Sequence, residues 1–403
     1  MRVLFVTPYL PYPPHHGGSI RVYELVRRLA ARHQVTLASL MDTADDRQHV
    51  PALEALGMRV MVAPRPAVQQ GASVKVRRFL SPWPRLLQEY VADDLQRRID
   101  EVIMNGSIDL VHCENLESAP LVAHHRRVPR VLAEQAITHT LYQRIAVARS
   151  SPVSRVAGQL DAFKVRQYER HIWREFAACI TITEAERDDV LRDAPGTRVY
   201  VVPNGVDTRT FTPTPGPRPP ATIIMTGSLD YFPNADGIRW FVSDIYPAIR
   251  ARRPDVTFLV VGKSTPEVDK SLSGVAGMQL VGRVPDVRPY VAQGTVFVVP
   301  LRIGGGTRLE ILEAMAQGIP VISTSVGCEG LGVVHEEHLL VADGAAAFVE
   351  AVLRLMADPA LQQRLSANAR RMVVERYDWD GIVCGLEVAY QETVQLSRHG
   401  QRA

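Results

Sequence analysis

Short apolar runs alternate with amphipathic helical stretches along this chain, and the whole alternation occurs twice. This pattern predicts parallel strands joined by crossover helices, since each apolar run suits one buried strand and each amphipathic stretch suits one covering helix. In the N-terminal half we expect strands at Val3–Thr7, Val35–Ser39, Arg59–Val62, Leu110–Cys113, Val131–Glu134 and Cys179–Thr183, and helices at Ser19–Arg32 and Phe163–Phe176. The first half is therefore predicted to be an α/β domain of the Rossmann type.

A proline-rich stretch separates the two series. The sequence changes character at Tyr200–Asp207, and Pro213–Pro220 is too rich in proline to enter a helix or a central strand, so we predict the inter-domain linker there. The second series is then expected as strands Thr222–Thr226, Thr257–Val261, Met278–Val281, Val296–Val299 and Pro320–Ser323, and helices Asp236–Ala251, Arg308–Gln317, Ala345–Met356, Pro359–Glu375 and Trp379–Leu396. A chain of 403 residues accommodates two such domains.

Composition excludes several other classes of protein. The balance of 46 basic and 43 acidic residues is too even for a nucleic-acid footprint over the whole chain, so we expect no nucleic-acid partner. The four cysteines lie far apart without a C-x-x-C pair, which argues against a disulfide framework or a cysteine zinc site. No signal peptide precedes the first strand, and no segment reaches the roughly 18 apolar residues that span a bilayer. We expect a cytoplasmic protein.

The densest group of functional signals is the stretch from Pro300 to Val321, which has the order strand, glycine loop, helix, strand. Gly304, Gly305 and Gly306 allow backbone N–H groups to approach a ligand closely, and a helix beginning near Thr307 adds the positive end of its dipole. Together these features predict a site for an anion such as a phosphate.

Charged side chains surround this loop. Arg302 and Arg308 flank it and could neutralise a diphosphate through bidentate contacts. Glu313 lies five residues beyond Arg308 on the same helix, where its carboxylate could accept hydrogen bonds from two ribose hydroxyls. The alternative is a tight turn with surface charges or an ion pair and no ligand.

The stretch Leu312–Thr324 resembles the signature of retaining glycosyltransferases of the GT-B fold, in the large group called family four. Further pieces that resemble this family are Ile182–Arg187, Val202–Asp207, Gly227, Leu259–Gly262, Val281–Val284 and Val298–Pro300. The resemblance covers nearly the whole chain and is strongest between residues 180 and 335. It implies two Rossmann-like domains with parallel sheets facing across a cleft, residues 1–204 binding the acceptor and residues 205–377 binding a nucleotide sugar. It also implies that the last helical stretch, 378–403, packs back on the first domain.

Two departures from the family pattern affect the expected site. Glu313 corresponds to the second glutamate of the family's E-x7-E motif, which holds the ribose, but Gly305 stands where the first glutamate would be. We expect the backbone amides from Gly305 to Thr307 to replace it beside the transferred sugar. The family's Arg and Lys phosphate clamp is also replaced, by the stretch from Gly227 and Ser228 to Gly237, and Arg302 and Arg308 are expected to compensate.

The resemblance implies further contacts from other strand ends. Arg283, after the predicted strand Met278–Val281, could pack on the nucleobase, or be an ordinary arginine of a loop. Gly17 and Gly18 are expected near the donor phosphates and the acceptor, unless they only form a turn. The family often has a histidine near the transferred sugar; the matching position is Gln135, with His139 four residues later, and we select His139 as the catalytic candidate while leaving Gln135 open.

The mechanism implied by the family needs neither a protein nucleophile nor a metal. The single Asp-x-Asp, Asp378–Asp380, opens a helical stretch and is interpreted as helix capping, so no cofactor is expected besides the nucleotide-diphosphate sugar as co-substrate. The acceptor would be a saccharide, a lipid-linked sugar or a small molecule, and a bacterial surface polysaccharide or glycolipid is our interpretation of the product.

The cationic and aromatic stretch Val74–Arg85 suits an anionic membrane surface, or else packs on its own domain. Peripheral association with the inner face of the membrane is therefore one expectation. The alternatives to a transferase are a sugar-nucleotide epimerase or a phosphorylase on the same fold, and a non-enzymatic two-lobed binding protein.

Overall fold

The structure is a computed structural model that describes residues 1–67, 77, 81–106, 108–148, 151–214, 216, 219, 221–304 and 307–400. Gly305 and Gly306 of the glycine loop, and half of the stretch Val74–Arg85, lie outside the described residues. The chain divides into two compact units, one made of Met1–Pro203 with Asp380–Ala403 and the other of Asn204–Trp379. The proline-rich stretch predicted as the linker therefore belongs to the second unit, because the chain passes between the units at Pro203.

The first unit is built on a parallel sheet of seven strands in the order β3-β2-β1-β4-β5-β6-β7. The strands are β1 (Arg2–Thr7), β2 (Gln34–Met41), β3 (Arg59–Pro64), β4 (Leu110–Glu114), β5 (Arg130–Ala133), β6 (Ala178–Thr181) and β7 (Val199–Val201). Strand β1 pairs with β2 on one side and with β4 on the other, so the strand order reverses between β1 and β4. In open parallel sheets, ligands bind beyond the carboxyl ends of the strands at such a reversal.

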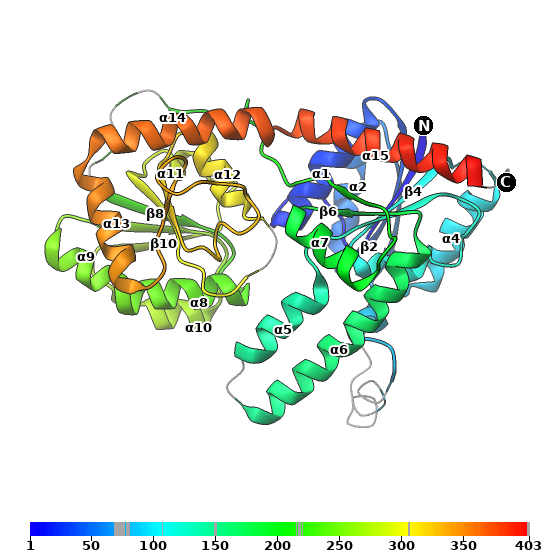
Figure 1. The fold of residues 1–403 in the computed structure, drawn as a ribbon, viewed down its shortest axis with the longest axis horizontal. Coiled ribbons are helices and arrows are strands. Elements are labelled where there is room, and N and C mark those ends of the chain that lie inside the picture. The colour runs from blue at the N-terminus through cyan, green and yellow to red at the C-terminus, as the bar shows by residue number, and fades with distance from the viewer. Residues whose placement is uncertain are drawn as a thin grey trace. The chain divides into compact units, whose positions relative to one another are not determined.

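Helices cover this sheet (Figure 1). They are α1 (Gly17–Ala30), α2 (Val50–Glu54), α4 (Asp93–Met104), α5 (Thr138–Ala148), α6 (Pro152–Glu175), α7 (Glu184–Asp193) and α15 (Trp379–Gly400), with short helices η1 (Ala44–His49), η2 (Leu86–Glu89) and η3 (Leu116–Leu121). Helix α6 is about twice as long as predicted. Its first half pairs with α5 in a hairpin that projects from the sheet (Figure 1). Several apolar side chains of this half are exposed, so the apolar residues there do not follow the pattern of a helix with one buried face.

The second unit repeats the plan with six parallel strands in the order β10-β9-β8-β11-β12-β13. Its strands are β8 (Thr222–Thr226), β9 (Thr257–Val261), β10 (Met278–Gly282), β11 (Val296–Val299), β12 (Val321–Ser323) and β13 (Leu340–Val341). Its helices are α8 (Phe232–Trp240), the π-helix η4 (Phe241–Ile245), α9 (Tyr246–Arg252), α10 (Pro266–Leu272), α11 (Arg288–Val291), α12 (Leu309–Ala316), α13 (Ala345–Ala357) and α14 (Pro359–Arg376). The reversal of strand order lies between β8 and β11.

The predicted helix Asp236–Ala251 is interrupted by the π-helix because Pro247 follows it. A proline has no N–H for the carbonyl four residues earlier, here that of Ser243, and its ring clashes with that carbonyl in a regular helix. A turn of π-helix relieves the clash.

Both sheets are buried on both faces, as parallel sheets are when helices cover each side. In β1, the side chains of Val3, Leu4, Phe5 and Val6 are all inaccessible to solvent. The two units together confirm the predicted α/β fold with two Rossmann-like domains. Within the described part of the chain, no helix combines the length and apolar character that a membrane crossing requires.

Candidate functional site

Glycines occupy the carboxyl ends of three neighbouring strands in the second unit. Gly227, Gly262 and Gly282 follow or end β8, β9 and β10, and all three have positive φ angles, of 138°, 155° and 80°. The chain is tightly packed here: Gly227 N–H donates to the Val261 carbonyl at 3.0 Å, and a Cβ on Gly262 would lie 1.9 Å from the Gly227 oxygen. Glycine is required at Gly262 and Gly227 by this packing, because the Gly227 carbonyl and the Asn234 side chain occupy the space that a Cβ would need.

A lysine joins the loops that follow β8 and β9. Lys263 Nζ lies 2.7 Å from Asp230 Oδ2, and Ser228 Oγ donates to Asp230 Oδ1 at 2.6 Å. These hydrogen bonds from Lys263 and Ser228 lower the pKa of Asp230. Lys263 was not singled out from the sequence, although it follows the quoted stretch Leu259–Gly262 directly.

Side chains contact Thr307 and Gly304, two described residues between β11 and α12. Asn204 Nδ2 donates to Thr307 Oγ1 at 3.0 Å, and both residues are buried. Gly304 lies under the Arg308 guanidinium, since a Cβ on Gly304 would come within 2.4 Å of Arg308 Nη2. The loop thus leads into α12 with Thr307 held in place and Arg308 folded back over Gly304, just before the first helical residue, Leu309.

Arg302 is engaged by an acidic neighbour. Its guanidinium makes two hydrogen bonds to Asp236, at 2.9 and 2.6 Å, and lies 5.7 Å from the ring centroid of Trp240. The hydrogen bonds that Arg302 donates to Asp236 raise the pKa of Arg302. The structure therefore places Arg302 in a bidentate ion pair with α8, whereas Arg308 lies beside the glycine loop.

Glu313 and Glu310 lie one turn apart on α12, and both are partly buried. Burial raises the pKa of Glu313 to about 8, and the charge of Glu310 adds to the effect. Burial also raises the pKa of Glu310. At neutral pH Glu313 is consequently protonated for most of the time, so its carboxyl can donate one hydrogen bond as well as accept.

Arg283 follows β10 directly, and its side chain is exposed. It makes no hydrogen bond or ion pair with the described residues. Its guanidinium is available to a ligand at the same edge of the sheet as Gly282.

In the first unit, Gly17 and Gly18 form the first turn of α1, which follows the loop after β1. His16 and Ser19 cap this helix, with the His16 side chain accepting from the Ser19 N–H. A Cβ on Gly18 would lie 2.4 Å from Tyr9 Oη and 2.8 Å from Gln135 Oε1. Glycine is thus required here because two side chains from other strand ends pack against the start of the helix.

Below these residues lies a buried polar network that the sequence analysis did not find. Gln135 Nε2 donates to Tyr9 Oη at 3.2 Å and to Glu114 Oε1 at 2.8 Å. His112 Nε2 lies 2.7 Å from Glu114 Oε2, and Tyr390 Oη lies 2.7 Å from His112 Nδ1. Tyr9 and Gln135 follow β1 and β5, whereas the other members lie on β4 and α15, so only the folded sheet brings them together.

The network holds one charge pair. Burial would raise the pKa of Glu114, but hydrogen bonds from His112 and Gln135 and the charge of Arg21 outweigh it and lower that pKa. Burial lowers the pKa of His112. Neutral His112 therefore donates from Nε2 to the Glu114 carboxylate and accepts from the Tyr390 hydroxyl. Arg21 Nε lies 3.3 Å from Glu114 Oε1.

Asn115 follows β4 at the reversal of strand order, with φ 62° and ψ 154°. Essentially only glycine adopts this combination of φ and ψ without strain, and any other residue is destabilised there by on the order of 1–3 kcal/mol. Asn115 Nδ2 donates to Tyr9 Oη at 3.4 Å. Such strain is concentrated at functional sites in proteins, which adds weight to this edge of the first sheet.

His139 and Gln135 have different surroundings. His139 is 7% exposed at the start of α5, where its Nδ1 lies 2.5 Å from Glu169 Oε2 and its Nε2 lies 3.8 Å from Asp193 Oδ2. Asp193 in turn makes a bidentate pair with Arg166. The structure thus places His139 in a buried ionic cluster between helices, and Gln135 beside Gly18.

Comparison with known proteins identifies the family of the chain. The model of "Glycosyltransferase Family 4" matches residues 15–210, and that of "Glycosyl transferases group 1" matches residues 220–358. The chain belongs to this family of glycosyltransferases. It is an enzyme of the sugar-transferring class, which excludes a non-enzymatic binding protein.

Similar proteins include full-length relatives. An uncharacterised 44.6 kDa protein of the Klebsiella pneumoniae cps region is 21% identical and covers 94% of this chain and 96% of its own length. The phosphatidyl-myo-inositol mannosyltransferase of Mycobacterium leprae is 26% identical over 74% of this chain and 77% of its own. Among solved structures, HepE of Anabaena in complex with UDP and glucose has a TM-score of 0.69 at 15% identity, over 97% of this chain and 99% of its own. At this identity the last comparison supports the fold alone.

Proposed function

We propose that this glycosyltransferase moves a sugar from a nucleoside-diphosphate sugar to a saccharide, lipid-linked or small-molecule acceptor with retention of the anomeric configuration. The observation that carries the proposal is the set of groups at the reversal of strand order in the second unit. Gly227 and Gly262 with their positive φ angles, Thr307 with its hydrogen bond from Asn204, and Glu313 with its raised pKa all belong to segments that follow neighbouring strands. HepE, with the same fold, is a protein that binds UDP and glucose.

Each part of the donor has a matching group in this proposal. The diphosphate is bound by the amides from Gly304 to Thr307 at the start of α12, with positive charge from Arg308 and Lys263. The ribose hydroxyls donate to the Glu313 carboxylate.

Arg283 packs on the base. Arg302 contributes indirectly, because its ion pair with Asp236 fastens the loop after β11 to α8.

The transfer step needs no metal and no nucleophile from the protein. The bond between the anomeric carbon and the phosphate oxygen breaks, and the acceptor oxygen forms its bond on the same face of the sugar. The acceptor proton passes to the departing phosphate oxygen, and the nucleoside diphosphate leaves. The amides of Gly305 and Thr307 stabilise the developing negative charge, which is the electrostatic form of catalysis.

An exposed apolar stripe supports the further proposal that the protein touches a membrane where it meets a lipid-linked acceptor. Val153, Val156, Leu160 and Phe163 are 80%, 69%, 38% and 58% exposed on α6. Their spacing of three and four residues puts them on one face of the helix, opposite the face that α5 covers. An apolar helix face of this kind inserts into the interface of a bilayer.

A thermal-shift screen of UDP, GDP and ADP and of their sugars tests the donor proposal. We expect one nucleotide class to stabilise the wild type, and we expect Glu313→Ala to lose most of that stabilisation. Glu267→Ala is the matched control, since this glutamate is 90% exposed on α10 of the same unit. Absence of binding by every nucleotide at millimolar concentration would refute the proposed donor.

Product analysis then separates transfer from its alternatives. A transferase consumes acceptor and donor in equal amounts, whereas an epimerase consumes no acceptor and a phosphorylase requires free phosphate. The anomeric configuration of the product glycoside, measured by NMR and compared with that of the donor sugar, decides between retention and inversion. Vesicle sedimentation of the wild type and of Phe163→Ser tests the membrane contact, which would be rejected if both bind anionic vesicles equally.

A further inference from the structure

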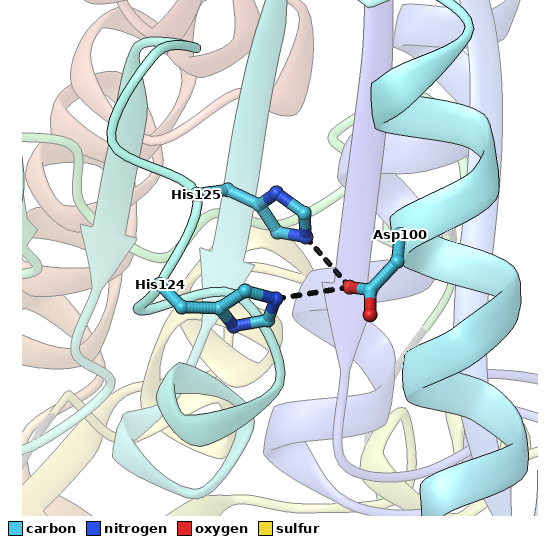
Figure 2. A group of neighbouring side chains, drawn as sticks. All are labelled: Asp100, His124 and His125. Carbon is cyan, nitrogen blue, oxygen red and sulfur yellow. Dashed lines mark hydrogen bonds and ion pairs between the residues drawn. The ribbon is translucent and has the colours of Figure 1, made fainter.

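Two histidines converge on one carboxylate in the first unit, away from the strand ends described above. Asp100 lies on α4, and His124 and His125 lie in the turn after η3 (Figure 2). His124 Nε2 is 3.0 Å from Asp100 Oδ1, and His125 Nε2 is 2.6 Å from the same oxygen. One ligand atom from each of the three residues lies within 4.8 Å of the others, and the two rings are 4.0 Å apart between centroids.

The turn that carries the histidines is held by the buried Arg130 at the start of β5. Arg130 Nη1 donates to the carbonyls of Val122, at 3.2 Å, and of Ala123, and Nη2 donates to the Glu175 carbonyl at 2.6 Å. Arg126, next to the histidines, is paired with the Glu175 carboxylate at 2.7 Å. The histidines are thus presented by a backbone that Arg130 holds in place.

A second contact orients one of the rings. Gln96, one turn before Asp100 on α4, lies with Nε2 3.4 Å from His124 Nδ1. If Nε2 of His124 binds a metal, Nδ1 carries the proton, and a rotation of the Gln96 amide presents its oxygen as the acceptor. Such outer hydrogen bonds accompany most histidine ligands of metals.

The three groups suit a divalent transition metal. Two imidazoles and one carboxylate are ligands for zinc and its neighbours, whereas calcium and magnesium require more oxygens than one aspartate supplies. Zinc binds such atoms at about 2.0–2.2 Å in a tetrahedron, which separates its ligands by about 3.4 Å. The Nε2 atoms of His124 and His125, now 3.0 and 2.6 Å from Asp100 Oδ1, need to move away from it by about 0.4 and about 0.8 Å to reach this separation, which small rotations of the two rings provide. Solvent fills the remaining coordination position, because His124 is 47% exposed.

We propose that Asp100, His124 and His125 form a binding site for one divalent transition-metal ion of the zinc class. The site lies at the amino-terminal edge of the sheet: α4 leads into the start of β4, and the histidines precede the start of β5. The proposed sugar transfer uses the opposite, carboxyl-terminal edge. The metal is therefore structural, and it ties α4 to the connection between β4 and β5 without entering the reaction.

Metal titration of the full chain, without an affinity tag and after dialysis against a chelator, tests the site. We expect one equivalent of Zn²⁺ by calorimetry, Co²⁺ absorption bands of a low-coordinate site, and a higher thermal midpoint with Zn²⁺. His124→Ala/His125→Ala, and separately Asp100→Asn, should weaken Zn²⁺ binding by more than about tenfold and abolish the midpoint shift. His171→Ala is the matched control, because His171 is an exposed histidine of the same unit that makes no hydrogen bond or ion pair with the described residues.

Three results would overturn the proposal. The first is that the wild-type protein binds Zn²⁺ no more tightly than the double variant. The second is that Asp100→Asn leaves Zn²⁺ binding unchanged. The third is that His171→Ala weakens Zn²⁺ binding as much as the double variant does. Circular dichroism of each variant without metal verifies that it is folded, so a loss of Zn²⁺ binding is not a loss of structure. None of these readouts uses sugar transfer, so failure of the metal site and failure of the proposed function remain distinguishable.

Discussion

The raised pKa of Glu313 makes donor binding depend on pH in a predictable direction. In the proposed complex the ribose hydroxyls donate to an ionised carboxylate, but in the free protein the pKa of Glu313 is about 8. The ionised fraction is then about 3% at pH 6.5 and about 76% at pH 8.5, so affinity should rise about 25-fold over this range, or roughly 2 kcal/mol. At pH 7, binding should release about 0.9 protons per donor bound.

Calorimetry with a nucleotide sugar measures both quantities. A nucleotide sugar is preferable to a free diphosphate, because its phosphates are esterified at both ends and keep their charge across this range. Titrations in two buffers of different ionisation enthalpy give the number of protons released. Glu313→Gln removes the titrating group at nearly constant volume and should bind with an affinity that is flat in pH.

Glu310 provides an internal check. Its charge helps to raise the pKa of Glu313, so Glu310→Gln should keep the rise in affinity and move its midpoint to lower pH. The reasoning would be refuted if the donor affinity of Glu313→Gln rose with pH as much as that of the wild type, or if wild-type affinity fell as pH increases. The sign for stability is opposite: because the folded-state pKa exceeds the unfolded value of 4.5, this group reduces folding stability as pH rises from about 4.5 through about 8.

Two further predictions concern stability, measured by denaturant unfolding. Gly262→Ala places a Cβ against the Gly227 oxygen and should destabilise the second unit by about 3 kcal/mol. The control Gly385→Ala adds a Cβ in open space on α15 and should be neutral or stabilising by up to about 1 kcal/mol. Equal effects of the two substitutions on the free energy of unfolding would contradict the packing argument. Arg21→Met leaves the buried carboxylate of Glu114 without its cation and should cost about 3–5 kcal/mol, part of which Glu114→Gln should restore in the double variant. No recovery in that double variant would show that packing rather than charge is responsible.

The fold was predictable because buried parallel strands are continuous apolar runs. The runs Val3–Thr7 and Thr222–Thr226 lie at the centres of their sheets, and both were identified from the sequence. The missed strands, Val199–Val201 and Leu340–Val341, are two or three residues long and lie on sheet edges, where the apolar pattern is too short to stand out.

The candidate site was predictable only where its residues are close in sequence. The loop from Gly304 to Glu313 is one contiguous stretch, so spacing and resemblance identified it. In contrast, the contact of Gly18 with Tyr9 and Gln135 joins three separate strand ends, and no local pattern marks it. The burial that shifts the pKa of Glu313 is likewise a property of the folded unit.

The path of the chain through the two units has a consequence for how such enzymes are exchanged between genomes. The second unit is one uninterrupted segment whose ends lie side by side, since the Val206 N–H donates to the Tyr377 carbonyl at 2.8 Å and Val206 pairs with Asp378 in a short bridge. Recombination can therefore replace it as a single cassette. The first unit offers no such cassette, because a stop codon before Tyr390 would remove the hydroxyl that contacts His112 in its centre.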